Sequence, residues 1–115
     1  MVKKKLKPVH PGEVLCEEFL NPLDLSVKSF AKALHVTPRR INELVAHKCG
    51  ITADTSLRLG KYFGNSAEFW MSLQMDYDLD VARLGVGAKI EKDVNRLRHN
   101  SESKTVFNSS RFNVR

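Results

Sequence analysis

The sequence predicts an all-α fold, and three features indicate it. Apolar residues recur at spacings of three and four along most of the 115-residue chain, which is the period of one helix face. Ser26, Thr37 and Thr52 each stand directly before such a segment, where a hydroxyl caps a helix N-terminus. No segment shows the apolar–polar alternation of a half-buried strand. A chain of this length is expected to form one domain around a modest core.

The first part of the chain is expected to be a basic arm followed by a helix. Residues 1–9 contain four lysines and lead into His10-Pro11-Gly12, where a helix over residues 11–20 opens. Its apolar stripe contains Val14, Leu15, Phe19 and Leu20. Asn21-Pro22 ends it, because proline cannot continue a helix interior.

Residues 27–46 are predicted to form two short helices joined by a tight turn. Phe30, Ala31 and Leu34 share one apolar face, and Ile41, Leu44 and Val45 give the same face on the second helix. Thr37 is a good N-cap and Pro38 is pre-organised for the first helical position. This arrangement matches the helix-turn-helix motif, in which the second helix enters the major groove of DNA.

The polar side chains of the second helix are candidates for reading bases. Arginine forms a bidentate pair with guanine and asparagine with adenine. An ordinary helical hairpin with solvated polar residues is the alternative. The residues expected to lie away from the core are Thr37, Pro38, Arg39, Arg40, Asn42, Glu43 and Ala46.

A fourth helix is predicted over residues 53–63, capped by Thr52 and ended by a left-handed Gly64. Its buried face is expected to comprise Ala53, Leu57, Gly60 and Phe63. Glycine in a helix interior costs about 1 kcal/mol relative to alanine, so close packing is the expected reason for Gly60.

A fifth helix, capped by Asn65 or Ser66, is the most aromatic segment of the chain. Since four helices already close a small core, its surplus apolar face predicts a homodimer interface, with a last core helix of a monomer as the alternative. The expected dimerisation residues are Phe69, Trp70, Leu73, Tyr77 and Val81.

The C-terminal part is expected to be only partly folded. Gly85 and Gly87 are predicted to interrupt the helical pattern, and Ile90, Val94 and Leu97 then mark a short amphipathic helix. The polar stretch after Asn100 has no period and is expected to be disordered. The predicted organisation is a flexible basic arm over residues 1–9, a helix-turn-helix domain with C-terminal dimerisation helices over 10–98, and a tail over 99–115.

Charge and composition exclude several classes of protein. The net charge of +6 comes from the two ends, since residues 9–88 carry eight basic and ten acidic side chains. Basic ends either neutralise phosphates or act as solubilising tails. Two cysteines give no disulfide framework, and His47-x-Cys49 alone is too weak a signal for a metal site, so neither metal nor cofactor is expected.

The acidic residues and the lack of long apolar runs exclude two further classes of protein. Glu17-Glu18 and the alternating Asp76, Asp78 and Asp80 are best explained as solvated helix charge, so an enzyme is not expected. No apolar run approaches the ~20 residues that span a bilayer, and the N-terminus does not continue into a signal peptide. We therefore expect a cytoplasmic protein with no membrane association.

Two long segments closely resemble one bacterial family. HPGEVLCEEFLNPLDLSVKSFAKALHVTPRRINELV and GITADTSLRLGKYFGNSAEFWMSLQMDYDLDVA resemble the HigA/VapI-type antitoxins of the XRE (lambda-repressor-like) helix-turn-helix family. The resemblance covers about residues 10–98, and HPGE, GITADTSLRLGKYFG and SAEFWMSLQMDYDL are specific in that order. It implies a five-helix lambda-repressor-like domain with a short C-terminal helical extension.

The resemblance also implies a function and its residues. Such proteins are dimers that bind operator DNA, repress their own operon and neutralise a small HigB-like toxin, a ribosome-associated mRNA endonuclease. Arg39 and Asn42 are then the first choices for reading bases, and Lys28, Arg40 and Lys48 for contacting phosphates. The other DNA-contacting positions that carry over are Thr37, Pro38 and Glu43.

The chain departs from the family pattern around its recognition helix. The following loop is AHKCG where NGKRG is usual, so His47 replaces a glycine and Cys49 a frequent arginine, which removes one expected phosphate contact. His35 stands where many relatives have a left-handed glycine. Two alternatives remain: a solitary regulator without a toxin, and a protein-binding module that has lost DNA affinity.

Overall fold

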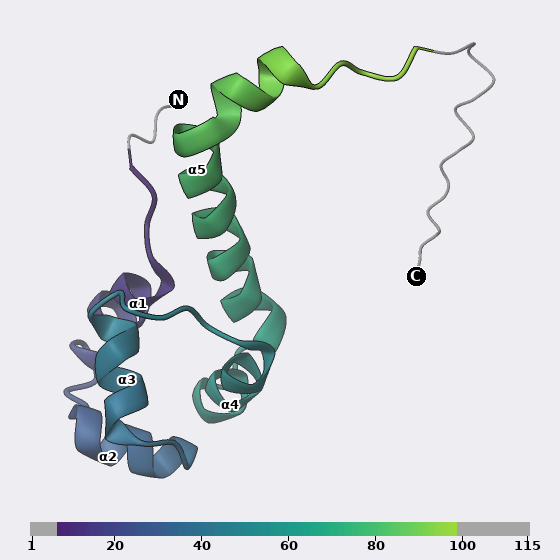
Figure 1. The fold of residues 1–115 in the computed structure, drawn as a ribbon. Helices are drawn as coiled ribbons and strands as arrows, with labels where there is room; N and C mark the ends of the chain where they lie inside the picture. Colours follow the sequence, from purple (N-terminus) through teal and green to yellow (C-terminus); the bar gives the residue numbers. More distant parts are fainter. Residues whose placement is uncertain (1–6, 99–115) are drawn as a thin grey trace. The chain divides into compact units, whose positions relative to one another are not determined.

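The computed structural model describes residues 7–98, and every regular element within them is a helix (Figure 1). This confirms the predicted all-α class. The chain divides into two compact units, residues 1–85 and 86–115, which we treat separately. The lysines at positions 3–5 and the predicted tail over 99–115 lie outside the described residues.

The first helix occupies the predicted residues but is not a uniform α-helix. α1 (Pro11–Val14) continues directly into the π-helical segment η1 (Leu15–Leu20). The wider turn is visible in the backbone, because the Asn21 N–H donates to the Cys16 carbonyl, five residues earlier, at 2.9 Å. Leu15 and Leu20 point into the core and are buried. The sequence pattern did not predict the π-helical half.

α2 (Val27–Leu34) and α3 (Pro38–Val45) form the predicted helix-turn-helix and pack against each other (Figure 1). Ser26 and Thr37 cap them, as expected, with hydroxyls that accept from the backbone N–H three residues later. Five apolar side chains hold the pair together, and all five are buried. They are Phe30, Ala31, Leu34, Ile41 and Leu44.

α3 also packs against α1 at a point that only glycine fits. A Cβ atom on Gly12 would lie 1.9 Å from the carbonyl oxygen of Leu44. The start of α1 therefore touches the backbone of the last turn of α3. This contact holds the C-terminal turn of α3 against α1.

α4 (Ala53–Phe63) has the predicted bounds, the Thr52 cap and a left-handed Gly64 with φ +80°. Its predicted buried face is partly wrong. Ala53 and Leu57 are exposed, and Thr55, Ser56, Leu59 and Gly60 are buried instead. Residues two apart point in nearly opposite directions on a helix, so burial of Leu59 turns Leu57 outward.

Gly60 confirms the expectation of close packing. A Cβ atom at this position would lie 2.9 Å from the backbone nitrogen of Ala67 and 3.0 Å from the carbonyl carbon of Ser66. The chain therefore crosses α4 at Gly60 on its way into α5. A larger residue would push the start of α5 away.

α5 (Ala67–Asp93) is the longest described helix, with 27 residues. The predicted interruption at Gly85 and Gly87 is wrong, because α5 runs through both glycines. Glycine lowers helix stability by about 1 kcal/mol, but it keeps the N–H and C=O groups that continue the hydrogen-bond ladder. Of the three residues that marked the expected separate C-terminal helix, Ile90 lies in the last part of α5, whereas Val94 and Leu97 lie beyond its end at Asp93.

The described part of the second unit is short. Residues 86–98 contain the end of α5, where Lys89 Nζ lies 2.6 Å from Asp93 Oδ2 one turn later. Val86 and Ile90 are exposed on this helical end.

The core lies in the first unit, between the helix-turn-helix and the start of α5. Trp70 is its largest side chain, fully buried beside the rings of Phe19 and Phe63. The remaining buried apolar side chains come from η1, α2, α3 and α4 and from the loop before α4. They are Leu15, Leu20, Phe30, Ala31, Leu34, Ile41, Leu44, Ile51 and Leu59.

Candidate nucleic-acid interface

The outward face of α3 is set by the side chains beneath it. Ile41 and Leu44 are buried and orient the helix, while Arg39 and Asn42 lie on its exposed side. At the N-terminus, Thr37 Oγ1 accepts from the Arg40 N–H at 3.1 Å. The hydroxyl of Thr37 is therefore used for capping, and Pro38 occupies the first turn of the helix.

Part of the predicted DNA-binding set lies together in one place. A shallow surface depression of about 440 Å³ is lined by Arg39, Asn42, Glu43, Ala46 and Lys48. Four of these follow the i, i+3, i+4, i+7 pattern of one helix face, and Lys48 comes from the loop that follows. Within the depression, Arg39 Nε lies 3.1 Å from Glu43 Oε2.

The other predicted contacts lie around this depression and not in its lining. Thr37, Pro38 and Arg40 are exposed at the N-terminal end of α3, and Lys28 is exposed in the first turn of α2. None of the four lines the depression. Lysine and arginine side chains in such flanking positions suit phosphates better than base edges.

Arg58 of α4 fastens the turn between α2 and α3, a role that the sequence pattern did not reveal. Its Nη1 donates to the carbonyl oxygens of Leu34 at 3.0 Å and His35 at 3.4 Å. His35 adopts the left-handed conformation with φ +62°, as its position in the motif predicts. Arg58 thus satisfies carbonyls at the C-terminus of α2, where a helix leaves them unpaired.

Asp54 orients this arginine from one turn earlier in α4. Arg58 Nε lies 2.6 Å from Asp54 Oδ1. The hydrogen bond and charge of Arg58 hold the pKa of Asp54 below its usual value, and Asp54 raises the pKa of Arg58 in return. The spacing of Asp54 and Arg58, one helical turn apart, was a sequence signal for their ion pair. The sequence did not show that Arg58 also reaches the carbonyls of Leu34 and His35.

The loop after α3 contains two of the three departures from the family pattern, His47 and Cys49. His47 has φ +64°, in the left-handed region that the usual glycine adopts without steric cost. The His47 ring stacks on the ring of His10. Cys49 is half-buried, and burial raises the pKa of its thiol, so it is a poor nucleophile. The Ile51 N–H donates to Gln74 Oε1 at 2.6 Å, which ties this loop to α5.

His10 was expected only to open the first helix, yet it is a buried polar residue. Its Nδ1 accepts from the Gly12 N–H at 2.9 Å, and its ring also meets the edge of Tyr77. Burial, followed by the neighbouring His47, lowers the pKa of His10. The sequence gives a weak signal for this role, since histidine is an uncommon N-cap.

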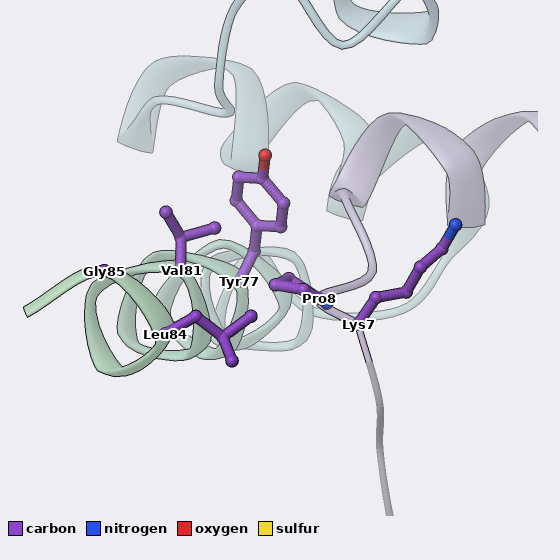
Figure 2. A pocket seen from close by; sticks show the side chains of 6 residues that line it. All are labelled: Lys7, Pro8, Tyr77, Val81, Leu84 and Gly85. Carbon is purple, nitrogen blue, oxygen red and sulfur yellow. The ribbon is translucent and has the colours of Figure 1, made fainter. Parts of the chain in front are cut away.

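A second surface feature is an apolar groove of about 470 Å³ between the N-terminal segment and α5 (Figure 2). Tyr77, Val81 and Leu84 extend from the same side of α5, and Pro8 lies opposite them (Figure 2). Lys7 and Gly85 complete the lining. Two of the predicted dimerisation residues, Tyr77 and Val81, therefore lie in a groove.

The remaining predicted dimerisation residues divide between surface and core. Phe69 is exposed, whereas Leu73 is half-buried and packs against the core. Trp70 is fully buried, and its Nε1 donates to Asn65 Oδ1 at 2.9 Å. Its prediction as an interface residue is wrong for this fold, because the ring fills the centre of its own chain.

Two negative findings apply to residues 7–98. In this range no three histidine, cysteine, aspartate or glutamate side chains gather in a way that would hold a metal ion. Within the same range, no helix is both long enough and apolar enough to cross a membrane.

Comparison with known proteins identifies the family. The chain is 54% identical over 80 residues to virulence-associated protein I of Dichelobacter nodosus, covering 70% of this chain and 74% of that one. It is 35% identical to antitoxin HigA-1 of Vibrio cholerae over 79 residues, covering 69% and 74% of the two chains. The chain belongs to the HigA/VapI family of helix-turn-helix antitoxins.

Structural comparison supports the same assignment. The antitoxin HigA of Pseudomonas aeruginosa, solved with the higBA promoter, matches with a TM-score of 0.77 at 43% identity. The match covers 80% of this chain and 100% of that one. No family model matches the sequence. HigA/VapI proteins are helix-turn-helix regulators and antitoxins, so membership places the chain among non-enzymes.

Proposed function

We propose that this protein is a sequence-specific DNA-binding repressor and the antitoxin of a HigB/HigA-type operon. One observation carries the DNA-binding part. α3 presents Arg39 and Asn42, and the loop after it presents Lys48, in one exposed depression, while Ile41 and Leu44 anchor the opposite side of α3. A helix that displays a guanine reader and an adenine reader, with a cation in the loop beside it, is suited to the major groove.

Each residue of the interface has a role in this proposal. Arg39 pairs with guanine and Asn42 with adenine, since their side chains match the acceptor and donor patterns of those bases. Lys28, Arg40 and Lys48 contact phosphates and so position the protein without specifying sequence. Thr37 and Pro38 fix the start of α3 near the DNA, and Glu43 lies beside Arg39.

The decisive experiment compares the protein's own promoter fragment with a scrambled duplex of equal length. Titrations at two salt concentrations should give tight, sequence-dependent binding that weakens steeply with salt. Arg39→Ala should cost roughly 1–3 kcal/mol of discrimination, or about 5- to 150-fold. Arg83→Ala is the matched control, because Arg83 is an exposed α5 arginine paired with Asp80 at 3.3 Å. Weak binding that is equal on both duplexes would favour a protein-binding module instead.

A homodimer is part of the same proposal. A dimer binds two half-sites about one helical turn apart, which gives the symmetry expected of an operator. The apolar groove with Tyr77, Val81 and Leu84, together with exposed Phe69, is the surface that we propose for the interface. An exposed apolar groove on a helix is stabilised when a second chain covers it.

Sedimentation tests the dimer with one variant and one control. Val81→Glu places a charge in the groove and should shift the protein to a single 13.1 kDa species. Leu57→Glu alters an equally apolar residue that is 65% exposed on α4, outside the groove, and should leave the dimer intact. A wild-type protein that sediments only as a monomer at micromolar concentration would contradict the interface.

Antitoxin activity depends on a partner gene. We propose that a toxin-sized gene adjacent to this one encodes a HigB-like toxin, and that both proteins act in the cytoplasm, where operator DNA and ribosomes are found. Expression of the neighbouring gene by itself should halt growth. Co-expression of that gene with the gene for this protein should permit growth. If no such gene is adjacent, the chain is a solitary regulator with the same DNA chemistry.

A further inference from the structure

We propose that Glu43 determines the sequence specificity of this interface by orienting Arg39, so that it acts as a positioning residue and not as a base reader. The inference rests on the proposed DNA-binding function. Glu43 lies one helical turn after Arg39 on the exposed face of α3, and its Oε2 accepts from Arg39 Nε at 3.1 Å. Both residues line the same depression.

The geometry of the pair leaves the useful end of Arg39 free. Guanidinium carries five N–H donors in a planar fork, and Glu43 takes the one on Nε. The two Nη groups remain for guanine O6 and N7. The Arg39 side chain is 87% exposed, and among the described residues it hydrogen-bonds to the Glu43 carboxylate.

Fixing this side chain before binding favours the correct base. A long exposed arginine loses rotamer freedom when it pairs with a base, and that loss weakens binding. A surface ion pair is worth little in water, but it becomes stronger once DNA excludes solvent from the groove. The Glu43 contact therefore restricts Arg39 to orientations that reach a base edge.

The charge of Glu43 adds a second contribution in the same direction. Its carboxylate shares the depression with Arg39, Asn42 and Lys48, and the two cations would otherwise attract any phosphate backbone. Glu43 repels phosphates, and only a guanine that engages Arg39 compensates for this repulsion. Weakening the wrong complexes is a recognised way to obtain specificity.

The experiment measures the ratio of affinities for the operator and the scrambled duplex. We expect Glu43→Ala to reduce this ratio by at least about fivefold, the lower end of what a bidentate arginine–guanine pair discriminates. Affinity for the scrambled duplex should rise. Glu43→Gln keeps an acceptor without the charge, so it should raise scrambled affinity yet retain part of the ratio.

A double-mutant cycle separates positioning from direct reading. If Glu43 acts through Arg39, Glu43→Ala should not change the ratio further in an Arg39→Ala background. Glu17→Gln, which removes an exposed carboxylate from η1, should leave the ratio unchanged and controls for net charge. Circular dichroism confirms that each variant folds.

The possible outcomes are distinguishable. An unchanged ratio in Glu43→Ala overturns the inference while the repressor function stands. An equal loss with and without Arg39 also overturns it, since Glu43 would then read a base itself. A wild-type ratio of one removes the proposed function and this inference together.

Discussion

The rings of His10 and His47 stack face to face, with centroids 4.6 Å apart and planes 11° apart. His10 caps the start of α1 through Nδ1, and His47 follows the end of α3. The edge of Tyr77 from α5 meets His10 at a centroid distance of 4.8 Å. The stack therefore joins the first helix, the loop behind the proposed recognition helix and α5 in one contact.

Stability should fall in mild acid because of His10. Burial, and next the proximity of His47, lower its pKa below 6.5, while the Cys49 backbone, Asp78 and Glu13 act in the opposite direction. At a pH between the two pKa values, the His10 imidazole is protonated in the unfolded chain and neutral in the folded chain. The contribution of His10 to the free energy of unfolding should be fully present above pH 6.5 and be lost as the pH falls from there through the lowered folded pKa.

Urea unfolding at a series of pH values measures this decrease. His10→Asn retains a side-chain acceptor for the helix cap and removes the titrating ring, so its profile should be flatter. A variant profile as steep as that of the wild type would show that another group is responsible.

Two glycines should respond oppositely to alanine. At Gly12 a Cβ atom would meet the Leu44 carbonyl oxygen at 1.9 Å and its carbon at 2.8 Å, and backbone atoms cannot move aside. Gly12→Ala should destabilise the fold by about 1–3 kcal/mol or more. At Gly85 no atom lies within 4 Å, so Gly85→Ala should stabilise the helix by up to about 1 kcal/mol. Thermal unfolding of both variants tests the pair, and a Gly12→Ala protein of wild-type stability would refute the close contact.

The two left-handed histidines of the helix-turn-helix and its loop should differ when changed to glycine. His35 is exposed with φ +62°, so His35→Gly should stabilise the fold by up to about 1 kcal/mol through relief of backbone strain. His47 has a similar φ of +64°, but His47→Gly also removes the ring stack with His10. Its gain should be smaller or reversed, since such a stack is worth about 0.5–1.5 kcal/mol. Denaturation midpoints in the reverse order would contradict this account.

Gln74 should stabilise the loop that carries Lys48. Gln74→Ala leaves the half-buried Ile51 N–H without its 2.6 Å acceptor, which should cost about 1–3 kcal/mol. Asp78→Ala removes only the exposed partner of Gln74 Nε2 and should have a much smaller effect. Hydrogen exchange at Ile51 reports the change directly, and unaltered protection of this amide in Gln74→Ala would disprove the role.

Local signals in the sequence predicted most of the helix boundaries. Ser26, Thr37, Thr52 and Gly64 cap or end helices as expected, because capping depends on residues only a few positions apart. The same signals failed at Gly85 and Gly87, since a glycine weakens a helix without ending it. They also misplaced the buried side of α4, where Leu57 and Leu59 competed for one core position.

The all-α class, the helix-turn-helix and the polar residues that α3 turns outward were predictable from the sequence alone. These depend on periodicity and capping within one or two helices, and the chain encodes both locally. Which apolar side chains are buried depends on how the helices pack, and this packing places Trp70 in the core and leaves Val81 in a groove. The same packing brings Arg58 to the turn, Gln74 to the loop and His10 to His47. Such contacts join residues 23 or more positions apart, and no spacing rule relates residues that far apart along the chain.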